Sequence, residues 1–377
     1  MISNIHLIGA GQTRFGELWD KSIRDLMEEA TDAAIANSPC TALDIDLIVV
    51  SNMLAEVTNG QAHLSAIASS LLPHHPPAIR VESACGSGAF ALHTAMAMLE
   101  SGRARNVLVI GVEKMTDVSM ETVASALMGA ADSEQERPAG LTFPGIFGLI
   151  AQRYMHDFGL SREDLSLVSA VHHRNACANP FAQFRSEITP DAVSSSAAVA
   201  DPLRLLDCSP ISDGAAACIL STEHVNGVRV AASQIASDSL SIIHRPVITS
   251  FSATKDAAER ALTEAGIKLK EIDVLETHDC FSIAALINLE DLGFCDPGQG
   301  INIYKDIFAR RGDSGIALGV NLSGGLKGCG HPVAATGIKQ VIDVAKQLQK
   351  TGRRYGLAHN FGGAAATCGV HILENVS

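Results

Sequence analysis

The sequence predicts a layered α/β protein built from two similar halves. Three observations support this: a helix–linker–strand plan occurs twice, a helix–glycine–strand plan occurs twice, and one long helix is apolar nearly all round. Alternating strands and helices predict parallel-rich sheets that are covered by helices. A helix that is apolar on every side is buried on every side. We therefore expect five layers, α/β/α/β/α, with buried helices between two sheets.

The first repeated plan is a helix, a short acidic linker and an apolar strand. Near the start, the helix Asp25–Asn37 leads through Ala42–Asp46 into the strand Leu47–Ser51. Much later, the helix Asp256–Gly266 leads in the same way into the strand Val274–Thr277. The two passages predict equivalent positions in the two halves.

The second repeated plan is a helix that opens near a glycine-rich turn and closes at a glycine. The helix Gly86–Ser101 closes at Gly102, and the helix Ala334–Thr351 closes at Gly352. Glycine at this place suits the left-handed conformation that ends many helices. The strands that follow directly are Asn106–Gly111 and Tyr355–Asn360.

The segment between the halves is rich in proline and glycine and has an irregular pattern, with a helical stretch at Phe147–Phe158. We predict an N-terminal half from residues 1–115 plus 201–225, an insertion from 116–200, and a C-terminal half from 226–377. Long insertions in compact domains are usually functional. The insertion is therefore interpreted as a lid over the active site.

Composition narrows the classes of function. Of the 377 residues, 47% are apolar and 18% are charged, which predicts a large core and argues against disorder. The formal charge of −13 is offset by no basic block, so no nucleic acid is expected as a partner. No apolar run is long enough for a membrane span, and no membrane association is expected. The nine cysteines are widely spaced and form no C-x-x-C pair. This pattern argues against a disulfide framework or a zinc ribbon and favours a reducing, cytoplasmic location.

Cys85 is the first candidate for chemistry. It lies in a Ser/Gly turn, within Val81–Leu92, where an extended segment stops and the apolar helix begins. Unpaired N–H groups and the helix dipole at such a place favour the nucleophilic thiolate. Gly86 and Gly88 allow backbone and substrate to approach closely. The alternative is a buried structural cysteine, the more usual role of a lone cysteine.

Three later segments carry further candidates. Thr277–Phe281 places His278 and Cys280 two residues apart at a strand end; alone, a loop histidine and a half-buried cysteine would explain it. The glycine-rich stretch Ser323–Pro332 surrounds His331, which projects ahead of a helix or is a structural histidine in a turn. Gly362 follows the last repeated strand, where free backbone N–H groups could bind an oxyanion or merely form a tight turn.

Together these segments resemble the thiolase family, in the branch of the sterol-carrier-protein-2-type thiolases and archaeal acetyl-CoA acetyltransferases. The resemblance spans nearly the whole chain and includes four further motifs: Gly11–Asp20, Gly111–Met115, Phe143–Gly145 and Ser209–Ala216. It implies the five-layered thiolase fold.

The resemblance also implies roles. Cys85 corresponds to the acylated nucleophile, and His331 to the histidine that activates it and helps to bind the thioester oxygen. Cys280 corresponds to the second, acid/base cysteine of this branch, and no cysteine occupies the C-terminal position used by other thiolases. The chemistry agrees, because it needs an acyl-carrying nucleophile, a base and oxyanion donors.

The remaining implied positions concern the oxyanions and coenzyme A. His278 takes the place of an asparagine in the first oxyanion hole. The second hole would use the backbone N–H groups of Cys85 and Gly362. Ser209 matches a position beside the pantetheine arm. The resemblance implies no permanently bound cofactor and no metal, with the coenzyme A thioester as substrate.

The leading hypothesis is a CoA-dependent thiolase that makes or cleaves a 3-ketoacyl-CoA, acetoacetyl-CoA first of all. A ketoacyl-synthase-type enzyme would not need Cys280. A thiolase-like subunit that acts on a different acyl substrate within a larger complex is the other alternative. A papain-like protease lacks its sequence context. As partners, the resemblance implies a homodimer or tetramer, and in the archaeal branch an HMG-CoA synthase with a small zinc-containing bridging protein.

Overall fold

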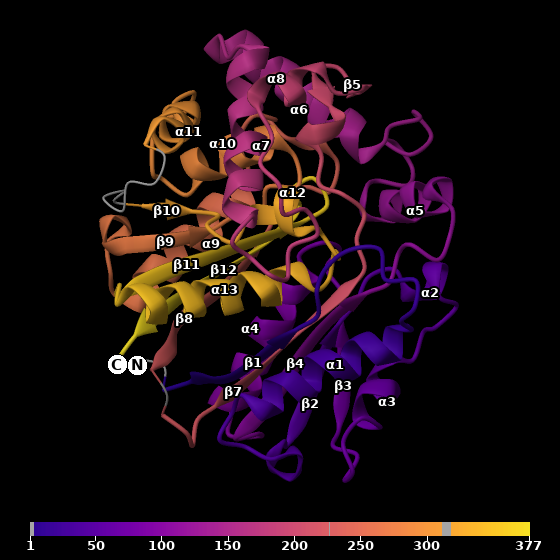
Figure 1. Cartoon of the computed structure of the whole chain (residues 1–377), viewed down its shortest axis with the longest axis vertical. Helices are drawn as coiled ribbons and strands as arrows, with labels where there is room; N and C mark the ends of the chain where they lie inside the picture. The colour runs from indigo at the N-terminus through magenta and orange to yellow at the C-terminus, as the bar shows by residue number, and fades with distance from the viewer. Residues whose placement is uncertain (1–3, 226, 311–317) are drawn as a thin grey trace.

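A computed structural model describes residues 4–225, 227–310 and 318–377. Residues 1–3, 226 and 311–317 fall within the two predicted halves and lie outside the described residues. In Figure 1 the N-terminal half lies at the bottom, the sheet of the C-terminal half crosses the middle, and a group of helices covers the top.

The N-terminal half contains a five-stranded sheet with helices on both faces. Its strands are β1 (His6–Gln12), β2 (Leu47–Ser51), β3 (Ala78–Val81), β4 (Asn106–Glu113) and β7 (Gly214–Ser221). Its helices are α1 (Ile23–Ala36), α2 (Ala55–Thr58), α3 (Leu64–Ser69) and α4 (Ser87–Glu100). Helix α1 starts at a capping box, in which Ser22 and Asp25 satisfy each other's backbone N–H groups.

The C-terminal half repeats this arrangement. Its strands are β8 (Val228–Ser237), β9 (Ile272–Glu276), β10 (Gly319–Val320), β11 (Tyr355–Gly362) and β12 (Thr367–Asn375). Its helices are α9 (Ser252–Ala265), α10 (Ser282–Asp291), α11 (Gly300–Ala309), α12 (Gly325–Cys329) and α13 (Thr336–Thr351). The glycines predicted to end two of the helices, Gly102 and Gly352, both adopt the left-handed conformation.

The internal repeat is visible in the strand order. The first half has the order β3-β2-β4-β7-β1, and the second has β10-β9-β11-β12-β8. A pairing of His6 with Arg229 joins the two into one sheet of ten strands. The predicted two-half architecture is thus confirmed.

The expectation of parallel-rich sheets needs correction, because each half is mixed. β2 pairs in parallel with β3 and β4, whereas β7 is antiparallel to β4 and β1. The second half has the same pattern. Strand β12 follows β11 after a short turn, and such a connection allows only an antiparallel neighbour.

Helices α4 and α13 form the middle layer and contact each other as well as strands of both sheets (Figure 1). They approach closely at two glycines. A Cβ atom on Gly88 would lie 2.9 Å from the Gly337 nitrogen, and one on Gly337 would lie 2.6 Å from the Ala89 nitrogen. The prediction that α4 is buried all round holds for its inner faces but not for its end, where Ala97 is exposed.

The segment between the halves is mainly helical rather than irregular. It contains α5 (Met120–Leu127), α6 (Phe143–Phe158), α7 (Arg162–Ala176) and α8 (Pro190–Ser195), followed by the short strands β5 (Ala198–Ala200) and β6 (Leu203–Arg204). Ser119, Thr142, Ser161 and Thr189 cap the four helices with their side chains. The glycines and prolines that indicated irregular structure lie largely at the helix ends.

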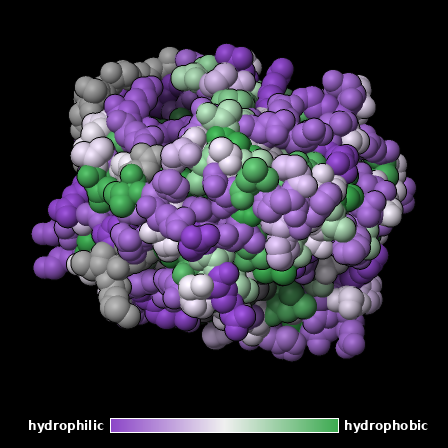
Figure 2. Space-filling model, turned by 90° about the horizontal axis from the view of Figure 1, so that it is seen from below, coloured by the Kyte–Doolittle hydropathy of each residue, from purple (hydrophilic) through white to green (hydrophobic). Residues whose placement is uncertain are grey.

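The surface seen from below the view of Figure 1 is mostly hydrophilic, with several separate hydrophobic patches (Figure 2). Such interspersed apolar residues are normal on a globular protein. Among the described residues, no helix combines the length and the apolar character that crossing a membrane requires.

Candidate active site

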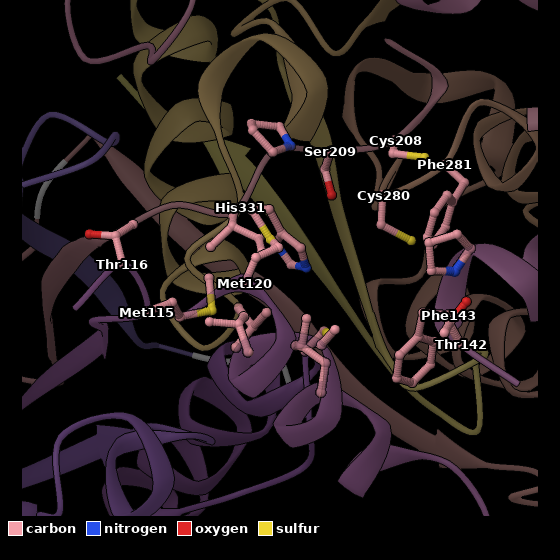
Figure 3. A pocket seen from close by; sticks show the side chains of 18 of the residues that line it. Met115, Thr116, Met120, Thr142, Phe143, Cys208, Ser209, Cys280, Phe281 and His331 are labelled. Carbon is pink, nitrogen blue, oxygen red and sulfur yellow. The ribbon is translucent and has the colours of Figure 1, made fainter. Parts of the chain in front are cut away.

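A cavity of about 630 Å³ lies where the two halves meet the helices above them. Four of the residues predicted from the sequence line it: Cys85, Ser209, Cys280 and His331. Ser209, Cys280 and His331 point into the same space (Figure 3). Residues far apart in the chain are therefore brought together as the sequence indicated.

Cys85 lies in a constrained turn between β3 and α4. Ala84 adopts a left-handed conformation with φ of 51°, which is uncommon for a residue with a side chain. The Ser83 N–H donates to the Ser87 hydroxyl (2.8 Å), and that hydroxyl donates to the Ala84 carbonyl (2.5 Å). A Cβ atom on Gly86 would lie 3.0 Å from the Gly362 nitrogen. The turn thus presents Cys85 to the cavity directly beside the last turn of the C-terminal half.

The ionisation of Cys85 differs from the expectation that a helix start favours thiolate. Burial of the thiol, with a further contribution from the Glu113 carboxylate, raises the pKa of Cys85 to about 12. The Gly363 and Cys85 backbone N–H groups lower this pKa but do not compensate. Glu113 is itself buried and accepts hydrogen bonds from the Leu54 (2.9 Å) and Met53 (3.1 Å) N–H groups. Cys85 is therefore a neutral thiol near neutral pH.

His331 is held as a neutral imidazole with a free nitrogen. The Thr336 hydroxyl donates to the Pro332 carbonyl (3.1 Å), so it accepts from Nδ1–H of His331 (2.7 Å). The proton on Nδ1 leaves a lone pair on Nε2, which has no hydrogen-bond partner in the described part of the chain. Burial lowers the pKa of His331 to about 3. His331 therefore offers a proton-accepting nitrogen in the cavity that Cys85 also lines.

His278 carries the opposite tautomer. Asn360 Nδ2 donates to Nδ1 of His278 (2.8 Å), which leaves the proton on Nε2. That Nε2–H has no partner within residues 4–225, 227–310 and 318–377. The ring stands nearly perpendicular to His331, with centroids 4.9 Å apart, and packs on Phe361 at 4.1 Å. His278 is not one of the cavity-lining residues but lies against one, and it presents a buried hydrogen-bond donor.

Cys280 lines the same cavity as Cys85 and His331. Its backbone carbonyl accepts a hydrogen bond from the Ser209 N–H (2.8 Å), which fixes Ser209 next to it. Burial raises the pKa of Cys280 well above its ordinary value, and Cys85 raises it further. The two thiols thus act on each other across one cavity, and both are protonated in the resting protein.

At the end of β11 the structure shifts one predicted contact by one residue. Gly362 pairs with Thr367 in the β-ladder, whereas the next residue, Gly363, lines the cavity and directs its backbone N–H at Cys85. Gly363 has a left-handed φ of 62°, which turns its N–H away from the ladder. The donor beside the thiol is therefore Gly363, and Gly362 provides the close approach to Gly86.

The apolar walls of the cavity come mainly from helices that the motifs did not identify. Met120, Val123 and Leu127 line it from α5, and Phe143 and Phe147 line it from α6. The spacing of three and four residues along α5 places its three side chains on one face. This spacing indicates from the sequence that one face of the helix is apolar. It does not show whether that face packs against the protein core or lines a ligand cavity.

The family description "Thiolase, N-terminal domain" matches residues 5–224, and "Thiolase C-terminal domain-like" matches residues 235–375. The chain belongs to the thiolase family. It is a thiolase-type acyltransferase, and the fold class predicted from the sequence is confirmed.

Thiolase relatives cover the chain almost end to end. It is 43% identical to an acetyl-CoA acetyltransferase of Methanothermobacter thermautotrophicus, over 98% of this chain and 99% of that protein. It is 32% identical to human sterol carrier protein 2, over 96% of this chain and 70% of that protein. The predicted branch of the thiolase family is thus confirmed.

Solved structures show the same fold. The structure described as "Ltp2-ChsH2(DUF35) aldolase" has a TM-score of 0.84 at 22% identity, with full coverage of both chains. Human mitochondrial 3-ketoacyl-CoA thiolase in complex with CoA has a TM-score of 0.77 at 18% identity, over 99% of this chain and 98% of that one. At these identities the likeness concerns the thiolase fold alone.

Proposed function

We propose that this thiolase interconverts two acetyl-CoA molecules and acetoacetyl-CoA plus free CoA. The observation that carries the proposal is the pair of thiols, Cys85 and Cys280, in one cavity with a neutral His331 whose Nε2 is free. The 43% identity to an acetyl-CoA acetyltransferase over almost the full length supports the acetyl group as the acyl unit.

The first half-reaction places an acetyl group on Cys85. As the Cys85 sulfur attacks the thioester carbon of acetyl-CoA, its proton passes to Nε2 of His331. The carbon–sulfur bond to CoA then breaks, and the leaving CoA sulfur takes the proton of Cys280. The products are acetyl-Cys85, free CoA, a Cys280 thiolate and a protonated His331.

The second half-reaction forms the carbon–carbon bond. The Cys280 thiolate removes a proton from the methyl group of a second acetyl-CoA, and the resulting enolate carbon attacks the acetyl carbon on Cys85. The bond to the Cys85 sulfur breaks, and this sulfur recovers its proton from His331. The same steps in reverse describe thiolysis, and no external oxidant or reductant is needed.

Hydrogen-bond donors are available for the negative charge that would develop on each reacting carbonyl. The unpartnered Nε2–H of His278 suits the enolate oxygen, and the backbone N–H groups of Cys85 and Gly363 suit the tetrahedral oxyanion at the acylated sulfur. We propose Gly363, together with the predicted Gly362, as the C-terminal part of this second hole. Ser209, fixed beside Cys280, is proposed to contact the pantetheine arm.

A second candidate is a thiolase subunit that works on another acyl group within a larger assembly. Several apolar side chains remain exposed around the cavity mouth, with Trp19 71% and Phe184 39% exposed. A docked protein or a longer acyl chain would cover them. Thiolysis of 3-ketoacyl-CoA substrates of increasing length distinguishes the candidates, because the first predicts the highest kcat/KM for acetoacetyl-CoA.

The test of the proposed chemistry uses Cys85→Ala and Cys280→Ala. We expect Cys85→Ala to lose acetoacetyl-CoA thiolysis and to form no acyl adduct. Cys280→Ala should still carry an acetyl group on Cys85, visible by mass spectrometry, but should not form the carbon–carbon bond. The buried but remote Cys218→Ala is the matched control and should remain active. Condensation at the normal rate by Cys280→Ala would refute the acid/base role.

A further inference from the structure

Lys327 is a buried cation with little to neutralise it. It lies in α12 with 1% of its side chain exposed. Its Nζ donates a hydrogen bond to the backbone carbonyl of Asp207. A buried ammonium group normally pairs with a carboxylate, because removal of a charge from water is costly.

The carboxylates near Lys327 are engaged by other groups. Arg162 lies 2.5 Å from the Asp207 carboxylate, which also accepts from the Ser282 hydroxyl (2.8 Å). His172 lies 2.7 Å from the carboxylate of Asp279. Within the described ranges Lys327 forms no ion pair of its own, although the charges of Asp279 and Asp207 still act on it.

Further hydrogen bonds hold the Asp279 carboxylate in place. Its Oδ1 accepts from Asn321 Nδ2 (3.0 Å) and from the Leu326 N–H (2.8 Å) in α12. A Cβ atom on Gly325 would lie 2.6 Å from Asp279 Oδ2. Helix α12 is therefore packed directly on the residue that precedes Cys280.

A short backbone segment, residues 207–209, links Lys327 to Cys280. Residues 207–209 run antiparallel to Cys280–Phe281, with a bridge between Cys208 and Phe281 and the Ser209 N–H donating to the Cys280 carbonyl. Lys327 holds the start of this segment through Asp207. Cys208 and Cys280 lie on the same side of the cavity (Figure 3).

We propose that Lys327 is a positioning residue whose positive charge stabilises the thiolate of Cys280 between the two half-reactions. The proposal rests on the proposed function, in which Cys280 gives its proton to the leaving CoA sulfur and must remain ionised until the second acetyl-CoA arrives. A fixed cation in a site of low dielectric is well suited to this, because it acts strongly and needs no reorganisation.

The ionisation of the surrounding groups is consistent with this role. Burial raises the pKa of Cys280, and Cys85 and the Asp279 carboxylate raise it further, while Lys327 and the Phe281 backbone N–H lower it. Burial lowers the pKa of Lys327, which Asp279, Asp207, Cys208 and Cys280 counteract. His173 also faces Lys327, and burial together with this cation lowers the pKa of His173 to about 4, so it adds no competing charge at neutral pH.

Two variants separate the charge of Lys327 from its anchoring hydrogen bond. Lys327→Gln removes the charge but keeps an N–H that can donate toward the Asp207 carbonyl, whereas Lys327→Met removes both. Alkylation of Cys280 by iodoacetamide, followed by peptide mass spectrometry across pH, reports its thiolate fraction without any turnover. Lys305→Met is the control, because it removes an exposed cation that pairs with Asp164 on the surface.

Both neutral variants should shift the Cys280 alkylation profile to higher pH. Removal of the cation raises the pKa of Cys280, so a shift of about one unit makes alkylation about ten-fold slower below that pKa. Carbon–carbon bond formation should fall by at least a similar factor, while Cys85 alkylation and thermal stability stay close to those of the Lys305→Met control.

Two results would overturn the proposal. One is an unchanged Cys280 profile in both variants. The other is a normal Lys327→Gln with an impaired and unstable Lys327→Met, which would assign Lys327 to anchoring alone. A failure of the proposed function would look different, since Cys280→Ala would then still condense acetyl-CoA whatever the alkylation profile shows.

Discussion

The close approach of α4 and α13 at Gly88 gives a prediction whose size follows from the structure. In Gly88→Ala, the new methyl group would lie 2.9 Å from the Gly337 nitrogen, 3.0 Å from the Ala334 oxygen and 3.0 Å from the Gly337 Cα atom. All three are backbone atoms, so no side chain can rotate away. Overpacking of this kind costs about 1–3 kcal/mol, and the better helix propensity of alanine returns at most about 1 kcal/mol. We expect a net loss of about 1–2 kcal/mol.

Thermal unfolding and thiolysis measure this prediction together. In a chain of this length such a loss lowers Tm by roughly 1–3 °C. Because α4 begins beside Cys85, a shift of the helix by a few tenths of an ångström should also lower kcat by about ten-fold. Gly129→Ala is the matched control, since its new methyl group would meet nothing within 4 Å. A Gly88→Ala variant as stable and active as the parent would refute the inferred helix contact.

Two further predictions concern the histidine and the cavity mouth. Thr336→Val removes the acceptor that fixes the tautomer of His331. We expect a loss of about 1–3 kcal/mol in stability and at least a ten-fold lower thiolysis rate. Normal activity would contradict the assigned tautomer. Trp19 is the single tryptophan of the chain and lines the cavity mouth, so CoA binding should change the intrinsic fluorescence in a saturable way. Trp19→Phe should lose this signal. An unaltered parent spectrum in saturating CoA would place CoA elsewhere.

The two-half architecture could be predicted because it is written into local patterns. The glycines that close α4 and α13 do so in both halves, and the helix–strand order repeats. The direction of β7 could not be predicted in this way. A long connection separates β7 from β4, so β7 could run parallel or antiparallel to it, and strand composition does not encode that choice.

Some features of the candidate site could likewise be predicted from the sequence, and others could not. Cys85, Cys280 and His331 stand in short motifs whose chemistry is local, and the structure brings them to one cavity. The tautomers of the two histidines depend on Thr336 and Asn360, which are contacts in space. The unpaired state of Lys327 likewise depends on partners that Asp207 and Asp279 find elsewhere. Such properties follow from the complete hydrogen-bond network and have no signature in one segment.

The ionisation of Cys85 and His331 constrains how the first step can occur. Burial raises the pKa of Cys85 to about 12 and lowers the pKa of His331 to about 3, so both groups are neutral in the resting site and a thiolate–imidazolium pair is disfavoured there. That pair is therefore not a resting state, and the N–H groups of the helix start do not make one. Proton transfer to His331 must accompany attack on the thioester, when the negative charge moves onto an oxygen that the backbone donors face.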